Sequence, residues 1–424
     1  MDKTGIEFLD KVFARIRWMK IPAYRRFYGR YGARKARILR DYVIFPLFGI
    51  KTIRQLRGKT PYRIEEIYEV LRLVFDWRKL IIAISRMILQ EIIEEYEKLP
   101  EDKKSRVKIT FSIDDTYDAK SGSEMEGTAT INDHHDGIVK RLYNPVLLYC
   151  VVDWMGKQFC FPLDMALWQQ RKKRGRKRSC GKPKKRNKPK AKPKPDPNHK
   201  KRWEYAHDML ESLIEHCEKN ELSLAGFELA GDNAYCIDRI FKLAERARLV
   251  FVARPKLTNS FKIDGKSDNL YYFGREMEGH RWKISRRLNI RYVKIKATHK
   301  KYGECVILFY QYLASGRLNI QCLIAGTTDI RADSLFLAFS RRWPIEVFFR
   351  NLKQVLAFSS YSGRKLRAVR GHYLLRMLTG TIVEMCIAFI RDNPKWRKLF
   401  PDSHITYGDL QGFIIEHYRF EALL

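Results

Sequence analysis

The chain has 424 residues, among them 83 lysines and arginines against 48 aspartates and glutamates, so its formal net charge is +35. A chain of this length can bury a large core and should form two or three domains of roughly 150 residues each, which excludes a small scaffold held by disulfides. The charge favours nucleic acid as the partner over an acidic membrane surface, and eight cysteines without a C-x-x-C pair predict buried thiols instead of a zinc site.

Residues 1–105 are expected to form a helical DNA-binding domain. The first twenty residues lack the uninterrupted apolar run of a signal peptide, which predicts a cytoplasmic, nucleoid-associated protein. In IPAYRRFYGRYGARKARILRDY, arginines and tyrosines alternate in a way that suits contacts with a phosphate backbone and its sugars or bases. An ordinary solvated helix face explains the same pattern equally well.

The hydrophobic period changes at residue 107. In VKITFSID every second residue is apolar, which is the pattern of a strand. NPVLLYCVVDW and KQFCFPLDMAL predict two further strands joined by a Met-Gly turn. We therefore expect a three-stranded meander to open the first part of a catalytic domain, residues 106–256.

A strongly basic segment interrupts this domain at residues 170–202. Positions 171–202 hold 18 lysines and arginines against one aspartate, so their net charge of +17 is nearly half of the total of +35. With five prolines and few apolar residues, the segment buries too little surface to become ordered. We predict a disordered loop that tethers DNA without sequence preference and releases it as salt rises; a merely solvated charge run is the alternative.

Helical and strand-like segments alternate from residue 203 to 256, which predicts a mixed sheet with helices on its faces. Residues 257–330 return to aromatic-rich alternating segments (NLYYFGR, RYVKIKA, ECVILFYQYL, LNIQCLIAGTT) and predict a β-strand insertion. Helices resume over 331–424, the C-terminal part of the catalytic domain and a helical tail. There the apolar run 374–390 contains Arg376 and Glu384, so it predicts a buried helix and no membrane span.

The stretch RRWPIEVFFRNLKQ predicts a helix that begins near Pro344. Its apolar residues recur at spacings of three and four and mark one buried stripe: Ile345, Phe348, Phe349, Leu352 and Val355. The other side carries Glu346 among the cations Arg342, Arg350 and Lys353. A carboxylate beside cations suits a metal and a phosphate together, although a glutamate in the first turn also complements the helix dipole.

Two other acids lie at the ends of predicted strands, where catalytic residues are common. Asp115 ends the strand in SIDDTYDAKSG, and Asp232 ends the strand in ELAGDNAYCIDRIF. Asp115 could instead be a turn residue, and Asp232 could cap the helix near Tyr235. Strand alternation puts Asp115 on the apolar side and Asp114 on the polar side, so it does not choose between them.

Together these residues resemble the DDE transposases of bacterial insertion sequences, specifically the insertion-sequence-four-like group with a Tyr-Arg-Glu-Lys signature. The signature has the form Y-x2-R-x3-E-x6-K, and its positions are occupied here by Phe339, Arg342, Glu346 and Lys353. Phenylalanine therefore stands where the family has tyrosine.

The same resemblance extends to the two aspartates. The family's first acid precedes a threonine, as Asp115 precedes Thr116, and its second lies in a D-x-x-Y segment, as Asp232 precedes Tyr235. This favours Asp115 over Asp114. Over residues 107–390 the resemblance implies an α/β, RNase H-like fold: a mixed sheet flanked by helices and interrupted by a β-strand insertion.

The implied activity is cut-and-paste transposition on double-stranded DNA through hairpin ends, with a homodimer pairing two terminal inverted repeats. Asp115, Asp232 and Glu346 would be the catalytic residues. Three carboxylates repel one another unless a cation lies between them, and oxygen ligands select Mg²⁺ or Mn²⁺. Two such ions about 4 Å apart would serve an in-line phosphoryl transfer.

The DNA contacts follow from the same resemblance and from the cations near the acids. The candidates are Phe339, Arg342, Arg350, Lys353, Arg254, Tyr235 and Trp282. Trp282 would receive a flipped base, whereas Trp343 is expected in the core. His134, His135 and Asp136 are interpreted as surface residues. The alternatives to an active transposase are a domesticated DNA-binding protein that has lost catalysis and an RNase H-like nuclease that cuts without joining.

Overall fold

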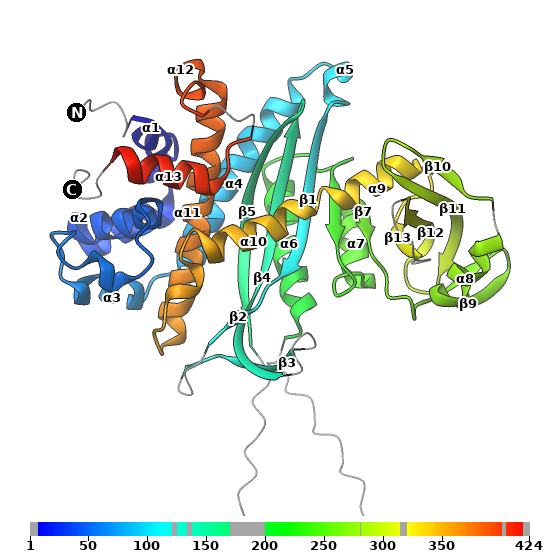
Figure 1. The fold of residues 1–424 in the computed structure, drawn as a ribbon, viewed down its shortest axis with the longest axis horizontal. Coiled ribbons are helices and arrows are strands. Elements are labelled where there is room, and N and C mark those ends of the chain that lie inside the picture. Colours follow the sequence, from blue (N-terminus) through cyan, green and yellow to red (C-terminus); the bar gives the residue numbers. More distant parts are fainter. Residues whose placement is uncertain are drawn as a thin grey trace, which may run out of the picture.

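The structure of the chain is a computed structural model that describes residues 7–120, 125–133, 138–169, 200–279, 281–313, 320–400 and 404–418. The predicted basic loop, over 170–199, and the segment His134–Asp136 lie outside the described residues. A sheet of 13 strands, both parallel and antiparallel, is flanked by helices and preceded by a helical region (Figure 1). The predicted α/β class with a mixed sheet is thus confirmed.

The helical region precedes the first strand, as predicted. Its α-helices are α1 (Glu7–Arg15), α2 (Pro22–Ile44), α3 (Ile64–Arg72), α4 (Trp77–Glu97) and α5 (Glu101–Lys104), with short 3-10 helices η2 (Trp18–Lys20), η3 (Phe45–Phe48) and η4 (Ile53–Leu56). The arginine- and tyrosine-rich segment forms α2, which is interrupted at Gly32, where φ is 79°. Positive φ favours glycine because it has no Cβ.

The predicted meander is present at one side of the sheet. β1 (Val107–Asp115) pairs antiparallel with β4 (Ile138–Trp154), which pairs antiparallel with β5 (Lys157–Trp168). The turn between β4 and β5 is Met155-Gly156, with φ of 54° and 88°, the left-handed geometry that two-residue hairpins require. The short strands β2 (Asp118–Ala119) and β3 (Ala129–Asp133) also pair with β4.

Parallel strands complete the central sheet. β6 (Glu228–Gly231) pairs with β1, and β7 (Val250–Ala253) pairs with β6. Helices α6 (Arg202–Lys219) and α7 (Asp238–Arg246) lie behind the strands in Figure 1, whereas α9 (Ala332–Ser340) and α10 (Trp343–Gln354) pass in front. The central strand order is therefore β5-β4-β1-β6-β7, with a helical layer on each face.

The described part of the segment between β7 and α9 forms the strands β8 (Ser260–Ile263), β9 (Lys266–Asn269), β10 (Lys283–Ser285), β11 (Ile290–His299), β12 (Gly303–Tyr312) and β13 (Gln321–Ala325). The predicted strands RYVKIKA, ECVILFYQYL and LNIQCLIAGTT correspond to β11, β12 and β13, whereas β8, β9 and β10 are not predicted individually. The strand prediction for NLYYFGR is wrong, because this segment forms helix α8 (Leu270–Glu276), followed by η5 (Met277–Gly279). Asn269 caps α8 by accepting from the Tyr272 amide at 3.1 Å, and Leu270 and Phe273 are buried at a spacing of three.

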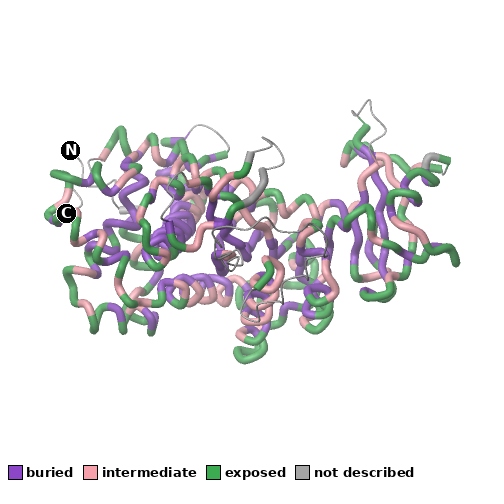
Figure 2. The backbone as a smooth tube through the Cα atoms, turned by 90° about the horizontal axis from the view of Figure 1, so that it is seen from below, coloured by how far each residue is buried: buried purple, intermediate pink, exposed green. Residues whose placement is uncertain are grey.

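The apolar C-terminal run is buried within the protein, as predicted. It belongs to α11 (Leu366–Asp392), which is long and apolar enough to span a membrane, but 78% of its apolar window is buried inside the structure; Figure 2 shows the buried backbone in purple. The fully buried Arg376 guanidinium lies 4.3 Å from the Tyr42 ring centroid and 4.4 Å from that of Phe45. Helix α11 also contacts η6 (Phe358–Ser360), α12 (Pro394–Arg397) and α13 (Tyr407–His417).

The described cysteines are all unpaired and buried, which agrees with the predicted role as small apolar side chains. They are Cys150, Cys160, Cys217, Cys236, Cys305, Cys322 and Cys386.

A close contact between α10 and α11 predicts the first measurable effect. Phe348 of α10 packs over Gly380 of α11, where an added Cβ would lie 2.5 Å from the phenyl ring. We expect Gly380→Ala to lower the free energy of unfolding by about 1–3 kcal/mol, since overpacking displaces well-packed side chains. Denaturant unfolding measures it. Gly29→Ala is the matched control, because nothing lies within 4 Å of that Cβ; equal stability of the two variants would contradict the packing.

Candidate active site

The parallel pairing of β1 and β6 brings two aspartates to the same end of the sheet. Ile113 pairs with Gly231, and the next residues along the two strands are Asp114 and Asp232. Paired residues of these strands point to one face, as the 2.6 Å hydrogen bond from Thr110 Oγ1 to Glu228 Oε2 shows. Burial raises the pKa of Asp114 to about 7; the Arg342 guanidinium opposes this shift, and the Asp232 carboxylate adds to it.

Helix α10 brings the glutamate to the same face. Ile345, Phe348, Phe349 and Leu352 are buried, as the predicted stripe requires, and Val355 is half-buried. This packing leaves Glu346 on the opposite side of the helix, half-buried. The Arg342 guanidinium, 12% exposed, donates to Asp114 Oδ2 at 2.6 Å and also to Glu346 Oε1. One partly buried cation thus connects two carboxylates that are 232 residues apart in sequence.

Asp115 follows Asp114 in β1, and both of its carboxylate oxygens are already hydrogen-bonded. Oδ2 accepts hydrogen bonds from Asn144 Nδ2 at 2.7 Å and Arg202 Nη1 at 2.9 Å, while Oδ1 accepts from the Tyr235 hydroxyl at 2.7 Å. These donors come from β4, α6 and the loop after β6. Asp115 is therefore held rigidly by three donors, whereas Asp114 faces Arg342.

Asp232 lies in the loop after β6. Its Oδ1 accepts from the Ala234 amide at 2.8 Å, which forms a local turn, and α7 begins only at Asp238. Asp232 is therefore not the cap of a helix near Tyr235. Burial raises the pKa of Asp232, and the nearby Asp115 carboxylate raises it further, while the Arg342 and Arg202 guanidiniums oppose the shift.

A cavity of about 470 Å³ opens beside these acids. It is lined by Asp114, Asp115, Thr116, Glu346, Phe349, Arg350, Lys353 and Gln354. Lys353 donates to Thr116 Oγ1 at 2.7 Å, and burial lowers the pKa of its ammonium group. Arg350 is exposed at the cavity. The structure therefore brings both strand-end aspartates of β1, the glutamate and two of the predicted cations to one place.

Phe339 lies between two arginines. The Arg342 guanidinium carbon is 5.5 Å from the Phe339 ring centroid, and that of Arg254 is 5.4 Å away. Arg254 is exposed directly after β7; its amide donates to Gly231 O at 3.3 Å, and its side chain donates to Gln321 Oε1 at 3.0 Å. An aromatic face attracts a guanidinium without needing a hydroxyl, so the phenyl ring packs against both cations, of which Arg342 bonds Asp114 and Glu346.

Two tryptophans have a role predicted from the sequence. Trp282 precedes β10 in the strand block, where its indole donates to Met277 O at 2.9 Å and lies 5.3 Å from the Arg291 guanidinium. Its contacts are thus with this block, and none of them joins it to the acids. The prediction of a core position for Trp343 is wrong, because 60% of this residue is exposed at the first position of α10.

Sequence reasoning missed several residues that organise the site. Asn144 and Arg202 carry no motif of their own, although Arg202 directly ends the basic run. Arg341 and Glu228 form a bidentate ion pair, with Nε to Oε2 at 2.8 Å, that fixes the start of α10 to β6. The two adjacent arginines before Trp343 contact different acids, Arg341 bonding Glu228 and Arg342 bonding Asp114.

The side chains have the chemistry that a divalent ion requires, because Asp114, Asp232 and Glu346 offer only oxygen ligands. The Arg342 guanidinium takes the cation's place between Asp114 and Glu346. In this arrangement no group of three His, Cys, Asp or Glu side chains within the described ranges could hold one ion. Because Arg342 bonds both Asp114 and Glu346, an ion that bound between these two carboxylates would displace the guanidinium from at least one of them.

A comparison with protein families matches residues 150–380 to the model described as "Transposase DDE domain". The matched span contains Asp232 and Glu346 and begins after Asp114 and Asp115. A search of curated proteins gives no match.

Proposed function

This chain belongs to the family of transposases with a DDE domain, which are metal-dependent enzymes acting on DNA, and we propose that it excises and inserts an insertion sequence of the insertion-sequence-four-like group. The signature residues Arg342, Glu346 and Lys353 support this subgroup. Phe339 occupies the tyrosine position, and its contact with two arginines supports a positioning role for the ring.

We propose Asp114, Asp232 and Glu346 as the acids that hold the ions, with Asp115 as the alternative that the family resemblance favours. The observation that carries this choice is the Arg342 guanidinium bonded to Asp114 and Glu346 at once. Two Mg²⁺ or Mn²⁺ ions, when bound there, would supply the Lewis acidity that activates a water or 3′-hydroxyl and stabilises the leaving oxygen. Asp115, Tyr235 and Arg202 would keep the end of β1 in place.

The cations beside the acids would bind the scissile strand. Lys353 and Arg350 line the cavity, where an ammonium supplies a point charge and a guanidinium supplies a bidentate fork for phosphate oxygens. When ions and DNA bind together, Arg342 would release the carboxylates of Asp114 and Glu346 and bind a phosphate of the DNA instead. Arg254, held against Phe339, would contact the strand at the neighbouring end of β7.

The whole reaction would be cut-and-paste: a nick at the element end, attack of the 3′-hydroxyl on the opposite strand to form a hairpin, hairpin opening and strand transfer. Residues 1–105 would bind the terminal inverted repeats, 106–256 and 331–424 would form the catalytic domain, and 257–330 would be its insertion. Two chains would pair two ends, in the cytoplasm, on the bacterial or archaeal chromosome.

The test uses full-length protein, a supercoiled plasmid carrying the DNA that flanks the gene on both sides, and Mg²⁺. We expect excised element with hairpin ends on a denaturing gel, followed by joined products. Pre-cut element ends that carry a 3′-dideoxynucleotide lack the attacking hydroxyl, so they should be bound and never joined. Cutting without joining on the unmodified substrate would favour a nuclease, and binding without cutting would favour a DNA-binding protein that has lost catalysis.

A further inference from the structure

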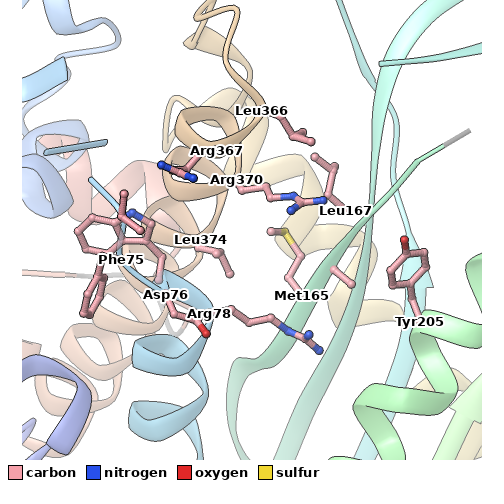
Figure 3. Close-up of a pocket in the computed structure, with 13 residues that line it drawn as sticks. Phe75, Asp76, Arg78, Met165, Leu167, Tyr205, Leu366, Arg367, Arg370 and Leu374 are labelled. Atoms are coloured by element: carbon pink, nitrogen blue, oxygen red, sulfur yellow. The ribbon is translucent and has the colours of Figure 1, made fainter. Parts of the chain in front are cut away.

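A second, larger cavity lies where the helical region meets the central sheet. Its volume is about 760 Å³, within the range of roughly 300–1,000 Å³ that is usual for ligand pockets. The lining includes Met165, Leu167, Tyr205, Arg367, Arg370 and Leu374. Figure 3 shows the side chains around this cavity, which come from the loop before α4 and its first turn, from β5, from α6 and from the first turns of α11, with Arg370 pointing toward Leu167.

The cavity is close to the acids. Ala166 of β5 pairs with Val146 of β4, and Val146 pairs with Asp115 of β1. Two strand spacings therefore separate its wall from Asp115, a distance of about 10 Å. Helix α6 connects the two sites as well, since Arg202 bonds Asp115 and Tyr205, one turn later, lines the cavity.

The cavity combines an apolar floor with a cationic rim. Met165, Leu167 and Leu374 are buried and form the floor. Arg367 and Arg370 are exposed one turn apart on α11, and neither has an ion-pair partner within the part of the chain that the structure describes.

The remaining charges at the cavity do not neutralise this rim. Arg78 is held by Asp164 through two contacts of 2.7 Å, so these two charges offset each other. Asp76, the N-cap of α4, is the one other acid in the lining. An apolar surface beside two uncompensated guanidiniums suits a ligand that carries a flat ring and a phosphate on one unit.

We propose that this cavity binds one unpaired nucleotide of the DNA strand that crosses the acids, with its base on the apolar floor near Tyr205 and its phosphates on Arg367 and Arg370. The proposal rests on the proposed function for the identity of the polymer. A base can lie on any aromatic or apolar face whatever its sequence, so the cavity recognises an unstacked nucleotide as such. This nucleotide would hold the duplex open next to the cavity that contains Glu346.

The test compares two probes that differ only in unpaired nucleotides. Fluorescence anisotropy, in EDTA so that nothing is cut, measures the dissociation constants of full-length protein for a blunt 30-base-pair duplex and for the same duplex with a five-nucleotide single-stranded end. We expect the wild type to bind the second probe about tenfold more tightly, the size of one base–aromatic contact. The double variant Arg367→Ala, Arg370→Ala should lose this preference.

Two further variants distinguish nucleotide binding in the cavity from a general electrostatic attraction between the protein and DNA. Lys242→Ala with Arg248→Ala removes two exposed charges in and just after α7, so any change in affinity should be equal for both probes and keep their ratio. Tyr205→Ala, which changes no charge, should reduce the ratio while blunt-duplex binding reports that the protein is folded.

Equal binding of the two probes by the wild type, or an unchanged ratio in the Arg367 and Arg370 variant, would overturn the nucleotide site. DNA binding measured in EDTA is independent of catalysis. A wild type that cuts and joins DNA without this preference would therefore refute the nucleotide site alone. A preference in a protein that never cuts would refute the proposed function alone.

Discussion

Asp114→Asn should reduce the rate of DNA strand cleavage by at least about a thousandfold, because residues that act as one catalytic unit fail together when one is lost. The substitution keeps the size of the side chain and removes its charge, so the ion-binding site loses one carboxylate ligand. Cleavage of an end-labelled terminal-repeat duplex in Mg²⁺ measures the rate. Unchanged affinity for the same duplex in EDTA shows that the fold and the DNA surface persist.

Asp115→Asn is the matched control, one residue along the same strand. Asp115 accepts from Asn144, Arg202 and Tyr235, so we expect its loss to disturb the position of β1 and to slow cleavage by only about 10- to 100-fold, as loss of a supporting partner does. The reverse order of the two effects would make Asp115 the ion ligand, as the family resemblance predicts, and would refute the assignment of Asp114.

Glu228→Ala should lower the free energy of unfolding by about 3–5 kcal/mol, the effect of breaking a buried ion pair. Glu228 is 9% exposed and accepts from Arg341 and from Thr110, so its removal leaves a partly buried guanidinium and a buried hydroxyl without their acceptor. Because Arg341 precedes Arg342, the start of α10 should also loosen. Urea denaturation monitored by tryptophan fluorescence measures the change.

The triple variant Glu228→Leu, Arg341→Leu, Thr110→Val tests whether the loss of stability comes from the unpaired charge. Replacing all partners with apolar side chains leaves no unpaired charge, and such replacements are often neutral or stabilising. We expect it to recover most of the stability lost in Glu228→Ala. A triple variant less stable than Glu228→Ala would show that packing, and not the unpaired charge, dominates at this position.

Periodicity predicted the elements that carry strong local patterns. The alternation after residue 107 and the apolar stripe of RRWPIEVFFRNLKQ correspond to β1 and α10, because burial on one face requires those spacings. The strand prediction for NLYYFGR was wrong because a segment of seven residues is too short for its pattern to distinguish a strand from a helix. In the structure the Asn269 side chain caps a helix there. The predicted core position of Trp343 was wrong because the size of a side chain alone does not determine its burial.

The arrangement of the site depends on pairing that no local pattern contains. Our proposal of Asp114 over Asp115 rests on the Arg342 guanidinium, which bonds both Asp114 and Glu346 and which only the folded chain brings to β1. The bridge from Arg342 to Asp114 spans 228 residues. Asn144 and Arg202 have ordinary neighbours in sequence and become recognisable only once β4 and α6 lie beside Asp115.

The most direct measurement of the central claim is a Mn²⁺ titration followed by electron paramagnetic resonance, with the protein bound to terminal-repeat DNA. The wild type should bind two ions per active site, and Asp114→Asn, Asp232→Asn and Glu346→Gln should each weaken that binding, although the three residues come from distant segments. Titration curves that all match the wild type would contradict the claim that these carboxylates share ions.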